Sequence, residues 1–258
     1  GFLLTWSRHD FKEGQAWNAA FSDQSAEVYW ATSKDGTKIP YFQVAPEQLS
    51  LDGKNRTLLY GYGGFNISQR PRFSVSRLAW MEMGGVYAVA NLRGGGEYGR
   101  EWHEAGMLAN KQNVFDDFIA AAQWLIDNDY TNSRKLAIQG GSNGGLLVGA
   151  CMVQRPDLFE AVVCQVPLLD MKRYNKLLAG ASWMAEYGNP DTDDWEYMKL
   201  WSPYQNLEAE ADYPEVFFWT NTRDDRVHPA HAGPALAFVP DDQDERPLPH
   251  RRHVEPFL

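Results

Sequence analysis

The chain has 258 residues, and its 24 lysines and arginines against 34 aspartates and glutamates give a formal net charge of −10. Hydrophobic residues make up 44% and charged residues 22%, a globular composition that excludes a disordered chain, collagen and a coiled coil. The acidic balance argues against a nucleic-acid binder, which needs a basic surface to displace counterions from phosphates. The longest apolar stretch, 146–153, is interrupted by Gly149 and falls short of the ~18 residues that a membrane span needs.

The two ends of the chain differ from its middle. Residue 1 is glycine and not methionine, so we expect an excised part of a longer protein. Residues 1–27 are aromatic and polar without a clear period, which predicts a linker or the trailing edge of a preceding unit. Residues 233–258 hold five of the chain's 14 prolines and predict an irregular tail or a segment foreign to the domain. The domain itself is predicted to span 28–232.

Two cysteines, Cys151 and Cys164, lie in apolar runs. Two thiols in such surroundings do not make a disulfide framework, and buried free thiols are typical of a reducing compartment. We therefore expect a cytoplasmic protein.

The middle of the chain alternates strand and helix patterns. A hairpin is predicted from a strand at 28–32, turn residues at 34–37 and a returning strand at 38–44. Helical patterns follow over 113–127 and 144–155. Five short apolar runs lack alternation, as strands buried on both faces of a parallel sheet do: 57–60, 86–91, 136–139, 161–166 and 216–220. This order predicts an α/β fold with a mostly parallel sheet and helices on both faces.

The strongest chemical signal is the motif G-x-S-x-G at 140–144, centred on Ser142. A predicted strand precedes it and a predicted helix follows, which is the context of a nucleophile elbow. There the serine sits at a strained apex, and the small neighbours let strand and helix pack closely. The alternative interpretation is a glycine-rich turn in which the serine caps a helix; the flanking elements favour the elbow.

Two further segments complete a hydrolase pattern. The glycine-rich loop 60–65 follows an early strand, where a second donor for an oxyanion hole is expected. Asp224 and Asp225 follow the strand at 216–220, and the carboxyl end of a late strand is where the acid of a Ser-His-Asp triad lies. An exposed, salt-bridged turn is the alternative for these two acids.

Two other motifs are set aside. The run 94–99 matches G-x-G-x-x-G, but the following residues, from Arg100 to His103, lack a small packing face. The H-x-x-H pairs at 228–231 and 250–253 lack the spacing of a helical zinc site. We therefore expect no cofactor and no metal.

Longer stretches of the chain resemble the peptidase domain of the prolyl oligopeptidase family, cytosolic serine peptidases that cut short peptides after proline. The resemblance runs from residue 28 to residue 231. It is most specific at 33–40, 59–68, 91–99, 109–113, 140–147 and 154–159. It implies an α/β-hydrolase fold, incomplete at the C-terminal end, and cleavage through an acyl-enzyme intermediate.

The resemblance also implies roles for particular residues. Ser142 matches the nucleophile, and Asp224 matches the aspartate of the triad. The backbone N–H of Asn143 and the hydroxyl of Tyr62 match the oxyanion donors. Arg226 matches the arginine that anchors the substrate backbone.

Four more positions match the pocket for the proline ring: Phe65, Trp183, Tyr187 and Val227. Leu168 falls at another pocket position, where the family pattern carries valine. The chemistry agrees, because proline presents a rigid apolar ring without an N–H, and an aromatic slot binds such a ring by stacking and burial.

The chain departs from the family pattern in two ways. The family carries a β-propeller before the peptidase domain, of which 1–27 would hold only the trailing edge. It also places its catalytic histidine in a Gly-His-Gly loop near the C-terminus, and this sequence has no such loop. His250 and His253 come at a plausible distance after Asp224 but beside Arg251 and Arg252. We therefore expect little peptidase activity from the chain as written.

Three functions stay open at this point. The first is a proline-specific serine peptidase, acting on short proline-containing peptides, with no nucleic acid or membrane partner and monomeric in the full-length protein. The second is an esterase or lipase on the same fold, which Arg226 and the aromatic slot disfavour. The third is a non-catalytic fragment, which the missing histidine loop favours.

Overall fold

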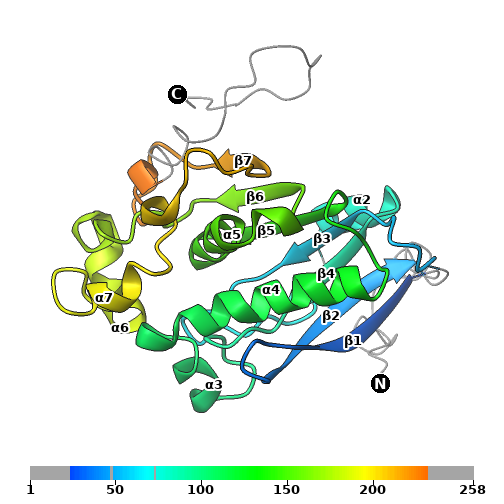
Figure 1. Cartoon of the computed structure of the whole chain (residues 1–258), viewed down its shortest axis with the longest axis horizontal. Coiled ribbons are helices and arrows are strands. Elements are labelled where there is room, and N and C mark those ends of the chain that lie inside the picture. The colour runs from blue at the N-terminus through cyan, green and yellow to red at the C-terminus, as the bar shows by residue number, and fades with distance from the viewer. Residues whose placement is uncertain (1–23, 47–48, 73, 232–258) are drawn as a thin grey trace, which may run out of the picture.

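A computed structural model of the chain describes residues 24–46, 49–72 and 74–231. One sheet crosses the molecule in the order β1-β2-β4-β3-β5-β6-β7 (Figure 1). Its strands are β1 (Gln24–Thr32), β2 (Lys38–Pro46), β3 (Thr57–Tyr60), β4 (Val86–Ala90), β5 (Leu136–Gly141), β6 (Ala161–Gln165) and β7 (Glu215–Trp219). The pairs β1–β2 and β2–β4 are antiparallel and the other pairs are parallel. The predicted hairpin and mostly parallel sheet are confirmed.

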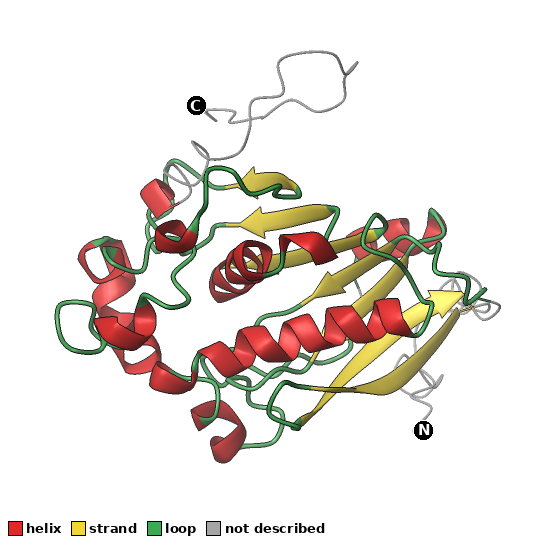
Figure 2. Ribbon diagram, viewed as in Figure 1, coloured by secondary structure: helices red, strands yellow, loops and turns green. Residues whose placement is uncertain are grey.

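Helices cover both faces of the sheet, as predicted. They are α2 (Val75–Glu82), α3 (Arg100–Glu104), α4 (Gln112–Asp127), α5 (Asn143–Gln154), α6 (Met184–Tyr187) and α7 (Trp195–Met198). The two long helices, α4 and α5, lie in front of the sheet in the view of Figure 2. They correspond to the helices predicted at 113–127 and 144–155, whereas α2 was not predicted.

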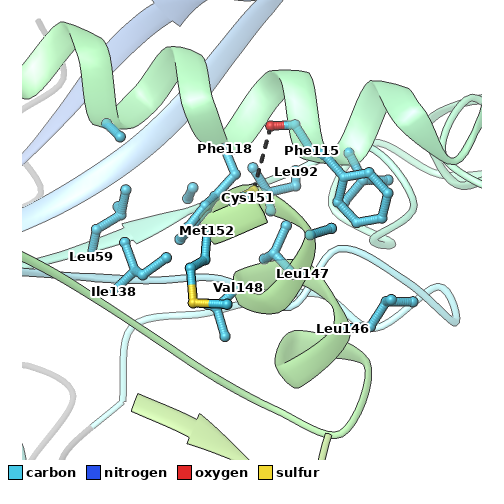
Figure 3. Packing of buried hydrophobic residues seen from close by; sticks show 14 of the residues in the cluster. Leu59, Leu92, Phe115, Phe118, Ile138, Leu146, Leu147, Val148, Cys151 and Met152 are labelled. Carbon is cyan, nitrogen blue, oxygen red and sulfur yellow. Dashed lines mark hydrogen bonds between the residues drawn. The ribbon is translucent and has the colours of Figure 1, made fainter. Parts of the chain in front are cut away.

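The larger core lies between the sheet and the helices α4 and α5. Phe118 of α4 and Leu147 of α5 meet Leu59 and Ile138 from the adjacent strands β3 and β5, and all four are buried (Figure 3). Cys151 on α5 is fully buried, with its Sγ 3.8 Å from the carbonyl oxygen of Phe115. Burial raises the pKa of this thiol well above its ordinary value, so it is an inert core residue.

A smaller core lies on the opposite face. Phe42, Tyr87 and Val89 form it, and Trp80 of α2 packs against them. Alternation along β4 explains the division, because Tyr87 and Val89 point to one face while Ala88 points to the other. The indole Nε1 of Trp80 donates to the carbonyl oxygen of Val86 at 2.9 Å and ties α2 to the strand.

The first strand is longer than the sequence predicted. Strand β1 begins at Gln24 and pairs with β2 up to Pro46, so the sheet starts inside the segment 1–27 that was expected to precede the domain. The pairing of β1 with β2 begins at Gln24, upstream of the apolar run 28–32 that predicted the strand. The rest of that segment, 1–23, and the tail 233–258 lie outside the described residues.

Strand order places the site. β3 pairs with β4 on one side and with β5 on the other, so the chain leaves β3 toward one edge of the sheet and returns to its opposite side for β5. In α/β sheets, ligand sites form outside the carboxyl ends of the strands at such a reversal. The register Tyr60↔Gln139 brings the loops after β3 and β5 side by side.

Within the part of the chain that the structure describes, no helix is long and apolar enough to cross a membrane.

Candidate active site

Ser142 occupies the turn between β5 and α5, as the motif predicted. Its backbone has φ 57° and ψ −116°, a conformation that a residue with a Cβ adopts only at a cost of order 1–3 kcal/mol. Its N–H donates to the carbonyl oxygen of Gln165 at 2.9 Å, which fixes the turn to β6. Ser142 is partly buried and directly follows the carboxyl end of β5.

The glycines of the motif let the turn pack closely. A Cβ on Gly140 would lie 2.1 Å from the carbonyl oxygen of Gly144, and a Cβ on Gly144 would lie 2.7 Å from the carbonyl oxygen of Gly61. Real Cβ contacts are not this short, so any larger residue would push β5, α5 and the loop after β3 apart.

Two hydrogen-bond donors stand next to Ser142. The hydroxyl of Tyr62 lies close enough to the serine side chain for Ser142 to lower the pKa of the phenol against the larger effect of burial. Burial raises the pKa of the Tyr62 phenol, so at neutral pH the group is protonated and can donate. Asn143 is the first residue of α5, and the first N–H groups of a helix have no acceptor within it.

The side chain of Asn143 fastens these parts together. Its Oδ1 accepts a hydrogen bond from the hydroxyl of Tyr187 at 2.8 Å, and its Nδ2 donates to the backbone carbonyl oxygen of Tyr62. Asn143 is itself buried. Asn143, the residue after Ser142, therefore joins the start of α5 to the loop after β3 and to helix α6.

The predicted pocket residues are brought together to different degrees. The rings of Phe65 and Tyr187 meet edge to face, with centroids 5.5 Å apart, and the hydroxyl of Tyr187 ties this pair to Asn143, the residue after Ser142. Trp183 ends the 3-10 helix Leu178–Trp183 and packs against the core while partly exposed. Leu168 and Val227 are buried in that core. The place of these last three residues next to the serine stays a prediction.

Asp224 and Arg226 lie in the loop that leaves β7. One carboxylate oxygen of Asp224 accepts the backbone N–H groups of Arg226 at 2.9 Å and Val227 at 2.8 Å, which closes the loop around the acid. Arg226 is exposed, and its charge lowers the pKa of Tyr62 against the larger effect of burial.

Comparison with known proteins agrees with this geometry. The profile of the prolyl oligopeptidase family of peptidases matches residues 71–244, more than half of the chain. The chain belongs to the prolyl oligopeptidase family.

Individual relatives are similar over most of the chain. An uncharacterized peptidase of Sinorhizobium fredii, y4nA, is 55% identical over 218 residues, which are 84% of this chain and 30% of that protein. The prolyl endopeptidase of Elizabethkingia meningoseptica is 52% identical over 210 residues, 81% of this chain and 30% of that one. A solved prolyl endopeptidase structure has a TM-score of 0.83 at 52% identity and covers 84% of this chain, which spans 32% of it. The chain thus spans about a third of the length of the relatives it matches, over a part with the α/β-hydrolase fold.

None of the three histidines that the structure describes is hydrogen-bonded to Ser142. His103 contacts Glu186, and Nδ1 of His228 accepts the N–H of Ala230. His231 is buried, and neither of its ring nitrogens has a partner in the described part of the chain. Burial lowers the pKa of His231 to about 4. The remaining candidates for a base, His250 and His253, lie outside the described residues.

The run 94–99 serves the packing of loops. A Cβ on Gly94 would lie 2.8 Å from the carbonyl oxygen of Gly63, and one on Gly96 would lie 2.4 Å from that of Asn66. The N–H of Asn66 donates to the carbonyl oxygen of Gly94 at 3.1 Å. The glycines therefore allow this segment to touch the loop that carries Tyr62.

Sequence reasoning missed three residues beside the site. Lys111 and Glu186 are a buried ion pair under the loop after β3, and His103 contacts the same glutamate. Two weak signals were present in the sequence: Lys111 lies in the stretch 109–113 that resembles the family, and Glu186 precedes Tyr187. Neither indicated burial, because charged residues are ordinarily assigned to the surface.

Proposed function

We propose that the protein is a serine peptidase of the prolyl oligopeptidase type that cleaves short peptides on the carboxyl side of proline. The observation that carries the proposal is Ser142 in a strained strand-to-helix turn with the hydroxyl of Tyr62 beside it. The buried thiols of Cys151 and Cys164 support the cytoplasmic compartment expected from the sequence.

In this mechanism Ser142 Oγ attacks the carbonyl carbon that follows the proline ring, and its proton passes to a base and then to the leaving amine. Water hydrolyses the resulting ester. The oxyanion of each tetrahedral intermediate accepts hydrogen bonds from the Tyr62 hydroxyl and the Asn143 N–H. One such donor contributes about 10²–10³ in kcat. Asp224 would orient the base, for which the proposal assigns a histidine outside the described residues.

The same site supports selection of proline. Phe65 is partly exposed, and its ring meets the buried ring of Tyr187, whose hydroxyl is bonded to the residue after Ser142. The proposal assigns this pair to the proline pocket and adds Trp183, Leu168 and Val227 as further walls. A proline ring fits such a slot because it is flat, rigid and without an N–H to satisfy. Exposed Arg226 would bind the carbonyl groups of the peptide backbone.

Binding tests the pocket without requiring a catalytic base. A peptide that ends in proline is expected to bind this chain more tightly than the same peptide ending in alanine, as measured by NMR titration. Trp183→Ala should weaken the binding of the proline peptide by about 5- to 150-fold, equivalent to about 1–3 kcal/mol, because it removes one wall of the slot.

Trp195→Ala is the matched control. Trp195 lies under the ammonium of Lys172 at 4.5 Å on α7 and is not assigned to the pocket. Equal affinity for the two peptides, or equal affinity of Trp183→Ala and the unsubstituted chain for the proline peptide, would contradict the proposal.

A further inference from the structure

The loop that carries Tyr62 has an unusual backbone. Gly63, Phe65 and Asn66 have positive φ angles of 64°, 55° and 56°. Two of them carry a Cβ, so each adds strain of order 1 kcal/mol or more. A loop of this kind keeps its shape only where the surrounding structure holds it. We call residues 62–66 the 62–66 loop.

A buried charge cluster holds this loop at two points. The ammonium of Lys111 donates to the carbonyl oxygen of Gly63 at 2.9 Å, and the carboxylate of Glu186 accepts the N–H of Phe65 at 3.0 Å. The two charges are 3.4 Å apart. Their side chains are 1% and 4% exposed, so water does not replace these bonds.

The ammonium of Lys111 and both carboxylate oxygens of Glu186 have partners in this cluster. Besides Gly63 and Glu186, the ammonium of Lys111 faces the ring of Tyr187, 5.3 Å from its centroid, so its three donors have three partners. The second oxygen of Glu186 lies 2.8 Å from Nε2 of His103. A satisfied buried network of this kind fixes one arrangement of its neighbours.

The cluster also reaches the other parts of the site. Glu186 precedes Tyr187, whose ring meets Phe65 and whose hydroxyl binds Asn143. The Lys111–Glu186 pair therefore contacts the loop that carries Tyr62, the residue assigned to the oxyanion. It also adjoins Phe65 and Tyr187, the aromatic pair assigned to the proline pocket.

We propose that Lys111 and Glu186 are positioning residues that hold the 62–66 loop in its strained form, with His103 orienting Glu186. They act through the backbone of the loop and touch neither substrate nor reacting atoms. The consequence for peptide binding rests on the proposed function, whereas the consequence for the loop itself does not.

Hydrogen exchange tests the loop directly. In Lys111→Met/Glu186→Gln, which leaves no unpaired buried charge, the amide hydrogens of Phe65 and Asn66 should exchange about tenfold faster, because the loop opens locally. Those of β4 should exchange as before. The affinity for a proline-ended peptide should fall at least about fivefold, since a displaced wall weakens binding.

Lys172→Met is the matched control, because Lys172 also donates to a carbonyl oxygen, that of Pro190 at 2.8 Å, and also covers an aromatic ring. Glu186→Gln alone is a second variant, which keeps the size of the side chain. If the double variant does not fold, faster exchange of the Phe65 amide hydrogen in Glu186→Gln supports the proposal. Unchanged loop exchange in a folded double variant, or in Glu186→Gln where the double variant does not fold, would overturn the proposal. An unsubstituted chain that binds no proline peptide would refute the proposed function and leave the exchange result decisive for the loop.

Discussion

Gly140→Ala is expected to destabilise the protein by about 3 kcal/mol or more, as measured by urea unfolding. The added methyl group would stand 2.1 Å from the carbonyl oxygen of Gly144 and 2.5 Å from its carbonyl carbon. Both are backbone atoms of α5, which cannot turn aside as a side chain can. The helix would have to move away from β5, and the turn that presents Ser142 would open.

Gly141→Ala is the control for that change. A Cβ at Gly141 would have its nearest neighbour, Cβ of Gln165, at 3.6 Å, an ordinary contact. Its φ is not positive, so alanine should change the stability by no more than about 1 kcal/mol. Equal effects of the two adjacent substitutions would show that the close approach at Gly140 is not what shapes the elbow.

Asp117→Ala is the second change with a large expected effect. The carboxylate of Asp117 is fully buried and pairs with Arg93, whose Nε and Nη2 donate to it at 2.9 and 2.6 Å, while the hydroxyl of Ser33 donates at 2.6 Å. In Asp117→Ala the guanidinium of Arg93, which is only 6% exposed, loses its buried partner. Breaking such a pair costs about 3–5 kcal/mol, to be measured as the shift in the free energy of unfolding.

Asp116→Ala is the control on the same helix. Asp116 is partly exposed and accepts one hydrogen bond, from Nε2 of Gln112 at 2.9 Å, so its loss should cost no more than about 0.5–1 kcal/mol. A similar effect for both aspartates would mean that Arg93 keeps adequate partners without Asp117. Asp35, which also binds Arg93, would then be sufficient.

Much of the fold could be predicted because the burial of a strand or helix leaves a recognisable pattern of apolar residues in the sequence. The continuous apolar run Val86–Ala90 reflects a strand buried on both faces, and the stripe along α4 reflects a helix that is buried on one. Helix α2 left no such trace, because only Met81 among its residues is buried and Val75 is 71% exposed.

The site divides in the same way. Ser142 was predictable because the elbow requires small residues at fixed positions around it. The loop 60–65 was predictable because it follows a recognisable strand, whereas Tyr62 itself was singled out only by the resemblance to the family. Lys111 and Glu186 were not, because no local pattern distinguishes a lysine that will be buried against a glutamate 75 positions away from one on the surface. Their burial depends on a contact between segments distant in the chain.

The central claim is that Ser142 is a nucleophile in a site that selects proline, and the identity of the acylated residue tests it most directly. The chain would be incubated with a peptidyl-proline 4-nitrophenyl ester, whose good leaving group lessens the need for acid catalysis, and the adduct located by mass spectrometry. We expect the acyl group on Ser142, none in Ser142→Ala, and slower acylation by the matching alanine ester. An adduct on a different residue, or one of equal yield in Ser142→Ala, would contradict the account.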